Sequence, residues 1–143
     1  MDQVVSVTRY HDFSAGHRVY GHESKCGHLH GHNYRVIWTV VSRVGLDTVG
    51  RVVDFSVIGE KLCRWLEDEW DHRMLLWEND PMLGPCRALD PTVVALPFNP
   101  TAENMADYLM NVVGVQQLGD TGLAVERVTV EETRKCSAAV WNR

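Results

Sequence analysis

The feature that most constrains this chain is a stretch of sixteen residues, from His17 to His32, in which histidine occurs five times. Its last part places His28, His30 and His32 at alternate positions, so an extended backbone projects all three side chains from one face. Two imidazoles at positions i and i+2 of a strand can chelate one metal ion, and Gly31 between them allows another backbone to pack closely. The stretch therefore predicts metal ligands on one face of an extended segment.

A third ligand has to come from another part of the chain, and His17, at the end of the preceding predicted strand, is the natural candidate. Three histidines with an open fourth position are typical of a catalytic zinc site, and Zn²⁺ is the metal that imidazole ligands favour. Two alternatives stay open: the histidines are exposed and bind no metal, or Cys26 completes a closed structural site. His11 and His22 fit no ligand pattern and are interpreted as surface residues.

Groups for proton transfer are expected at two further places. Cys26 lies four residues before His30 and next to Lys25; a nearby zinc ion or cation lowers the pKa of a thiol, which makes Cys26 a candidate base or nucleophile. Asp71 and His72 form a pair in which a carboxylate orients an imidazole, although the same pair can also serve only to end a helix. The remaining cysteines have no histidine neighbours and are interpreted as packing residues: Cys63, Cys86 and Cys136.

Length and composition restrict the class of protein. A chain of 143 residues predicts a single domain over 1–143. The formal net charge is −5 and there is no basic run, so we expect no nucleic-acid partner. The apolar runs are too short to span a membrane, and the sequence shows neither a secretory signal nor a CxxC motif. These features predict a cytoplasmic protein with reduced thiols.

The order of predicted elements indicates an α+β fold with mostly antiparallel strands. Hydrophobic periodicity and β-branched residues predict strands at 4–13, 34–41, 123–131 and 137–141, and an amphipathic helix over 55–70. The proline-rich stretch 79–100 predicts a loop that is long enough to be functional. Thr101 stands where the N-cap of a second helix belongs.

Several motifs in chain order carry a family resemblance: Phe13-Ser-Ala-Gly-His17, Cys26-x-x-x-His30-Gly-His32-Asn-Tyr, Val52-Val-Asp-Phe55, Trp70-Asp71-His72, Asn99-Pro-Thr-Ala-Glu-Asn104 and Val130-Glu-Glu-Thr133. Together they resemble the 6-pyruvoyl-tetrahydropterin synthase superfamily over most of the chain. The short spacing from Cys26 to the HGH motif is most similar to the bacterial 6-carboxytetrahydropterin synthase branch, which serves queuosine and other 7-deazaguanine pathways.

The resemblance implies a tunnelling fold: a four-stranded antiparallel sheet with two helices on one face, assembled into trimeric barrels and commonly hexamers. It implies zinc on His17, His30 and His32, and a proton-transfer group made of Cys26, Asp71 and His72. It also implies that Glu132 anchors the pterin ring, with Thr101 nearby from a neighbouring subunit.

The activity implied is a zinc-dependent lyase reaction that turns 7,8-dihydroneopterin triphosphate into 6-carboxy-5,6,7,8-tetrahydropterin, acetaldehyde and triphosphate. One alternative is a 6-pyruvoyl-tetrahydropterin synthase, which eliminates triphosphate without C–C cleavage; another is a non-catalytic zinc-stabilised module that binds a pterin. Lys25 and Arg18 are candidates for offsetting the triphosphate charge. The long 77–100 connection and His28 have no role assigned by the resemblance.

Overall fold

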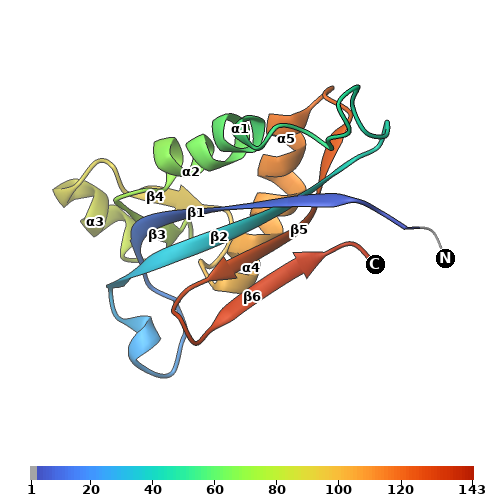
Figure 1. The fold of residues 1–143 in the computed structure, drawn as a ribbon. Helices are drawn as coiled ribbons and strands as arrows, with labels where there is room; N and C mark the ends of the chain where they lie inside the picture. The colour runs from blue at the N-terminus through green and yellow to red at the C-terminus, as the bar shows by residue number, and fades with distance from the viewer. Residues whose placement is uncertain (1–2) are drawn as a thin grey trace.

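A computed structural model describes residues 3–143 and shows one mixed sheet with helices packed on one of its faces (Figure 1). The strands are β1 (Ser6–His17), β2 (His30–Ser42), β3 (Arg73–Trp77), β4 (Val94–Leu96), β5 (Leu123–Glu131) and β6 (Ser137–Trp141). They form a six-stranded sheet in the order β4-β3-β1-β2-β5-β6. A 3-10 turn over Lys25–Gly27 lies in the loop between β1 and β2.

The long β1–β2 hairpin forms the centre of the sheet. Its antiparallel register places His17 opposite His30 and Ser6 opposite Val41. On the other side, β2 pairs antiparallel with β5, with an irregularity between Thr39 and Val40, and β5 pairs antiparallel with β6. Because β1 pairs with β2 from His30 onward, β1 holds the histidine-rich end of β2 in place.

The core lies between the sheet and its helices. In β2, alternate residues Tyr34, Val36, Trp38 and Val40 are all fully buried, and this period of two is what a strand with one covered face requires. The helices contribute a complementary apolar set at helical spacing: Ile58, Leu62, Leu66, Met105, Leu109 and Val113. Residues of even number in β2 therefore face the helices, and residues of odd number face away from them.

Each of the two helical segments contains one π-helical turn. The first consists of α1 (Phe55–Ile58), a π turn over Gly59–Cys63 and α2 (Arg64–Glu69), which confirms the helix predicted over 55–70. The second consists of α4 (Ala102–Tyr108), a π turn over Leu109–Val113 and α5 (Gly114–Leu118). The Thr101 hydroxyl accepts a hydrogen bond from the Asn104 amide at 3.1 Å, so the predicted N-cap is confirmed.

The expectation of a four-stranded, antiparallel sheet is wrong. Two strands lie beyond β1, and both run parallel to their neighbours: β3 beside β1, and β4 beside β3. The stretch expected to be a loop contains α3 (Leu83–Leu89) as well as β4. A three-residue strand among prolines is too short to show periodicity in the sequence, and parallel pairing depends on contacts that are remote along the chain.

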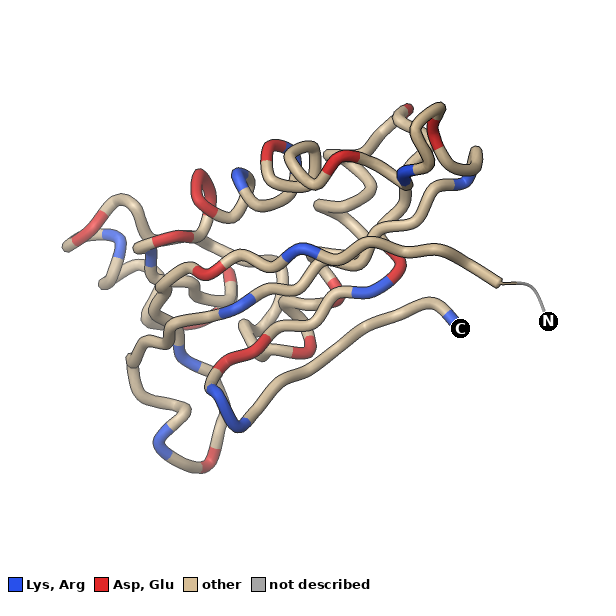
Figure 2. The backbone as a smooth tube through the Cα atoms, viewed as in Figure 1, with Lys and Arg blue, Asp and Glu red and all other residues tan. Residues whose placement is uncertain are grey.

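Charged residues are spread unevenly over the fold (Figure 2). Basic side chains occur in the β1–β2 loop, at Lys25, and in the β5–β6 turn, at Arg134 and Lys135. Both segments lie at the end of the sheet where β2 begins and β5 ends (Figure 1).

Within 3–143, no helix has both the length and the apolar character needed to cross a membrane.

Candidate metal centre and active site

Four side chains that can bind a metal converge where the β1–β2 hairpin ends: His17, His30, His32 and Glu132. His17 pairs with His30 across the hairpin, and His32 pairs with Ala15 two positions along, so the three imidazoles share the helix-facing side of the sheet. Glu132 follows β5 directly. It continues the alternation of Val128 and Val130, which are buried on the same side.

The ligand atoms are already at the separations that a metal ion requires. The Nε2 atom of His17 lies 3.0 Å from Nε2 of His30 and 3.2 Å from Oε1 of Glu132. The same Glu132 oxygen lies 2.8 Å from Nε2 of His32, and all four atoms fall within 4.8 Å of one another. Tetrahedral zinc with bonds of about 2.0–2.1 Å separates its ligand atoms by roughly 3.3 Å. The donor set therefore fits one such ion.

Main-chain carbonyl groups orient two of these imidazoles. The Nδ1 atom of His17 lies 2.7 Å from the carbonyl oxygen of Pro100, and Nδ1 of His30 lies 2.7 Å from that of His28. A carbonyl only accepts, so each Nδ1 carries the proton and each Nε2 presents a lone pair to the centre. His28 thus contributes through its backbone, while its own side chain is exposed.

Burial favours the neutral, ligand form of His32. His17 is 1% exposed, and burial lowers the pKa of His32. Nε2 of His32, although close to Glu132, is buried and makes no hydrogen bond of proper geometry. The neighbouring His17 imidazole is the chief cause that lowers the pKa of Glu132, against the opposing effect of burial. A neutral imidazole with an unpartnered nitrogen beside an ionised carboxylate is what a cation site presents.

Cys26 lies apart from these four side chains. It sits half-buried in the 3-10 turn of the β1–β2 loop. In the part of the chain that the structure describes, the group able to hold a metal has Glu132 as its fourth member and does not include Cys26. The closed site with a Cys26 thiolate is therefore not the arrangement observed.

Asp71 and His72 form the hydrogen-bonded pair that the sequence predicts. Oδ2 of Asp71 lies 2.8 Å from Nδ1 of His72, and Oδ1 accepts the amide N–H of Ser14 at 3.0 Å. Burial acts to raise the pKa of Asp71, but the Ser14 and His72 hydrogen bonds outweigh it and the pKa is lowered. His72 has a positive φ of 58°, its amide donates to the Ser14 carbonyl, and its side chain is 80% exposed. The pair is thus fixed to β1 while the imidazole faces solvent.

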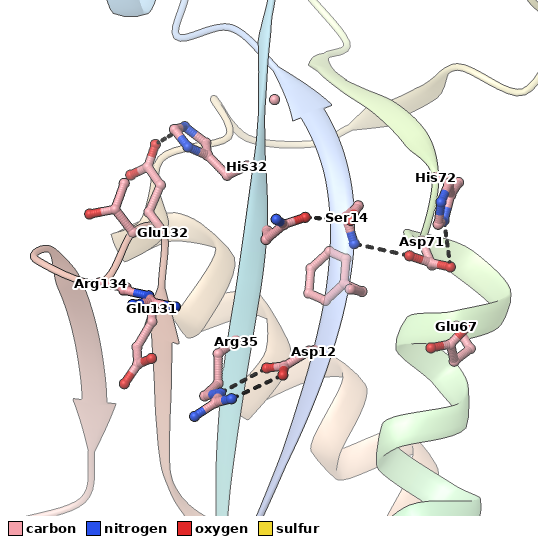
Figure 3. A pocket seen from close by; sticks show the side chains of 14 residues that line it. Asp12, Ser14, His32, Arg35, Glu67, Asp71, His72, Glu131, Glu132 and Arg134 are labelled. Atoms are coloured by element: carbon pink, nitrogen blue, oxygen red, sulfur yellow. Dashed lines mark hydrogen bonds and ion pairs between the residues drawn. The ribbon is translucent and has the colours of Figure 1, made fainter.

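An open pocket of about 1040 Å³ joins this pair to the metal cluster (Figure 3). His32 and Glu132 line one side, and Asp71 and His72 line the other. Figure 3 shows Arg35 and Asp12, joined by two hydrogen bonds of 2.8 and 3.0 Å, below them on the sheet. Among residues 3–143, neither Cys26 nor Thr101 belongs to the lining. Two of the three predicted proton-transfer residues therefore share a pocket with His32 and Glu132 of the metal cluster.

Comparison with known proteins shows which family this chain belongs to. The family described as 6-pyruvoyl tetrahydropterin synthase matches residues 6–143. The chain belongs to this family. It is 32% identical to the 6-carboxy-5,6,7,8-tetrahydropterin synthase of Rickettsia typhi and 33% identical to that of Rickettsia bellii, over 96% of this chain and 100% of each relative. The resemblance inferred from the sequence motifs is confirmed.

Solved structures share the fold of this pterin synthase family member. An uncharacterized protein from Wolinella succinogenes superposes with a TM-score of 0.85 at 26% identity, covering 99% of this chain and 100% of that one. The 6-pyruvoyl tetrahydropterin synthase of Caenorhabditis elegans gives a TM-score of 0.70 at 23% identity, covering 99% and 97%. The tunnelling fold is thus supported at the level of one subunit.

Some groups at the site of this family member have no sequence signal of their own. The Pro100 carbonyl and the Ser14 amide are backbone atoms, and only the folded chain shows what they bind. Tyr34 stands behind the cluster, with its ring centroid 5.9 Å from that of His17 and 5.4 Å from that of His32. In the sequence, Tyr34 belongs to the HGH motif and to a predicted strand, but nothing there assigns it a place beside the metal ligands.

The structure corrects two minor interpretations. His11, predicted as a surface residue, is partly exposed, and its Nε2 lies 2.6 Å from Oε1 of Glu67 on α2. Cys136 does not pack: its backbone shapes the β5–β6 turn by accepting the Glu132 amide, and its side chain is exposed. Arg18 is not a free cation for a triphosphate, because it is bound to buried Asp80. His22 is exposed and Cys63 is buried, as expected.

Proposed function

We propose that this chain is a zinc-dependent 6-carboxytetrahydropterin synthase. The reaction converts 7,8-dihydroneopterin triphosphate and water to 6-carboxy-5,6,7,8-tetrahydropterin, acetaldehyde and triphosphate. The observation that carries the proposal is the convergence of His17, His30 and His32 beside a pocket that also holds Glu132 and the Asp71–His72 pair. The names of the Rickettsia relatives, which match over their whole length, support the same activity.

The metal ligands in this proposal are His17, His30 and His32, with Zn²⁺ as the ion. Carbonyl groups hold Nδ1 of His17 and of His30, and the Nε2 atoms of all three imidazoles face one point. When bound, zinc supplies Lewis-acid stabilisation of the negative charge that develops on the substrate's side-chain oxygens. The histidines bind and orient that ion.

Proton transfer is assigned to Cys26, Asp71 and His72. The Cys26 thiolate would take a proton from the substrate side chain. The Asp71 carboxylate accepts the Nδ1 proton of His72, so it fixes the ring and leaves Nε2 free to exchange a proton with the substrate. The exposure of the His72 ring suits a group that meets a ligand from the open side of the pocket.

Glu132 is assigned to pterin recognition. The 2-amino group and the ring N–H of a pterin form a planar pair of donors, which one carboxylate can accept with both oxygens, as it does with arginine. Glu132 belongs to the pocket lining as well as to the metal cluster. It can therefore hold the pterin ring next to the reacting side chain. Thr101 would assist from a neighbouring subunit.

The assembly in this proposal is a trimer or a hexamer, with sites at the subunit interfaces. The sheet ends in β4 and β6, whose outer edges have no partner strand within residues 3–143. Pairing these edges between copies would close a barrel and protect them. All four cysteines are free thiols, which agrees with a reducing cytoplasm. The proposed product would serve queuosine or another 7-deazaguanine pathway, as the resemblance to the 6-carboxytetrahydropterin synthase branch implies.

Product analysis tests the proposal. Zinc-loaded protein incubated with 7,8-dihydroneopterin triphosphate should release acetaldehyde and 6-carboxytetrahydropterin, detected by mass spectrometry. A 6-pyruvoyl product without acetaldehyde would instead identify the pyruvoyl-forming reaction, with the same residues. Binding of the pterin without any turnover would leave a non-catalytic module.

A further inference from the structure

The loop that carries Cys26 (residues 18–29) is attached at its base to the 78–100 segment. The first attachment is an ion pair between Arg18 and Asp80. Nε and Nη2 of Arg18 donate to the two carboxylate oxygens at 2.7 and 2.6 Å, and the Asp80 side chain is fully buried. Oδ1 of Asp80 also accepts the Met82 amide at 2.8 Å. A bidentate pair of this kind fixes direction as well as distance.

The same arginine reaches the turn that holds Cys26. Nη1 of Arg18 donates to the carbonyl oxygen of Gly27 at 3.3 Å. The amide of Val19, the next residue, donates to the carbonyl oxygen of Cys26 itself at 2.9 Å. Asp80 therefore determines where Arg18 lies, and Arg18 and Val19 together hold the backbone carbonyl groups of Cys26 and of the next residue, Gly27.

The second attachment joins Tyr20 to Asn99. The Tyr20 amide donates to Oδ1 of Asn99 at 3.1 Å, and Nδ2 of Asn99 donates back to the Tyr20 carbonyl at 2.8 Å. The Asn99 carbonyl in turn accepts from Nδ2 of Asn104 on α4 at 3.0 Å. The next residue, Pro100, supplies the carbonyl that orients His17. One short piece of backbone thus holds both the Cys26 loop and a candidate metal ligand.

We propose that Asp80 and Asn99 are positioning residues that fix Cys26 relative to the metal centre. The inference rests on the proposed function, in which Cys26 is the base, and it gives the long 78–100 segment a role. Neither residue lines the pocket or belongs to the metal cluster. Their effect is on the distance over which the thiolate takes a proton, and proton transfer is steeply sensitive to such distances.

The test compares Asp80→Asn and Asn99→Ala with a matched control. Asp47→Asn removes the same kind of partner from Arg51, in an exposed pair of 2.9 Å that is far from the metal centre in the fold. The measurements are kcat and KM with 7,8-dihydroneopterin triphosphate, zinc per chain, and the rate at which iodoacetamide alkylates each cysteine. Peptide mass spectrometry separates Cys26 from Cys136, which is exposed and serves as the internal reference.

Both variants should lower kcat by roughly 10- to 100-fold with little change in KM, as expected when a reacting group is misplaced by about an ångström. Zinc content should stay at the wild-type level, and alkylation of Cys26 should become faster while that of Cys136 stays constant. Asp47→Asn should change none of these quantities. Asn99→Ala carries the test by itself if Asp80→Asn does not fold.

Wild-type kcat and a wild-type alkylation rate at Cys26 in both variants would overturn the inference, even if the variants are less stable. A wild-type protein that does not turn over the substrate would refute the proposed function instead. In that case, selective exposure of Cys26 in the two variants would still show that Asp80 and Asn99 hold its loop.

Discussion

Replacing Glu132 by glutamine should weaken pterin binding by about tenfold. A charge-assisted hydrogen bond is worth about 1.5–3 kcal/mol, and about 1.4 kcal/mol corresponds to a factor of ten in the dissociation constant. The Glu132 side chain is 24% exposed, so solvent screens part of this energy and the lower end of the range applies. Glutamine keeps the shape but places an NH₂ group where a ligand donor must be accepted.

The assay is isothermal titration of the zinc-loaded protein with 7,8-dihydroneopterin, which lacks the triphosphate. Glu131→Gln is the control. Glu131 pairs in register with Arg35 and Ser137, and because it lies one residue before Glu132, its side chain points to the other face of the sheet. Both glutamates line the pocket, so the two variants remove the same charge from nearly the same place. Only the direction of the side chain differs between them.

Three results would contradict this reasoning. Equal losses of affinity in both variants would show that the general negative charge matters and not a directed contact. An unchanged affinity in Glu132→Gln would place the pterin anchor elsewhere. Loss of zinc from Glu132→Gln would mean that this carboxylate, which lies within 3.2 Å of two of the imidazole nitrogens, is a required metal ligand.

Other properties of the chain can be checked in the same preparations. Purified protein should carry about one zinc per chain by elemental analysis. Alanine at His17, His30 or His32 should remove the zinc, whereas Cys26→Ala should keep it. Zinc loss from Cys26→Ala would favour a closed site. Sedimentation should show an oligomer, and a stable monomer at micromolar concentration would argue against the barrel. Asp80→Asn should lower the free energy of unfolding by about 3 kcal/mol at neutral pH, because it leaves Arg18 without its buried partner. The Arg18 hydrogen bonds lower the pKa of Asp80. The difference in unfolding free energy between wild type and Asp80→Asn should therefore be complete above about pH 5 and disappear as acid protonates the wild-type carboxylate. If urea titrations show a difference that does not change with pH, the ion pair is not its cause.

The sequence predicted those parts of the site that depend on alternate residues along one strand or on a helix cap. A period of two along one strand is enough to place His30 and His32 together, and the hairpin register adds His17. The strands predicted at 123–131 and 137–141 have the observed bounds, because β-branched residues lie between clear turns. Each of these features depends on residues that are close along the chain, or on a single antiparallel pairing.

The end of β1 shows why other parts were missed. The small residues Ser14, Ala15 and Gly16 predicted that the strand ends near Phe13, yet β1 continues to His17. At Gly16, β3 approaches closely: a Cβ atom there would lie 2.6 Å from the Met74 side chain. Small residues can mark either the end of a strand or a close contact with a neighbour, and only the three-dimensional pairing distinguishes the two.

The last residue of β1 and the residue that follows it are both held by the 78–100 segment. His17 ends β1 with its imidazole in the metal cluster, and the Arg18 side chain binds Asp80. The Pro100 carbonyl holds the first, and the Asp80 carboxylate, from the same 78–100 segment, holds the second. A shift of this segment would therefore move a metal ligand and the Cys26 loop together. This coupling is a physical reason why a segment remote in sequence from the histidine motif can affect the active site.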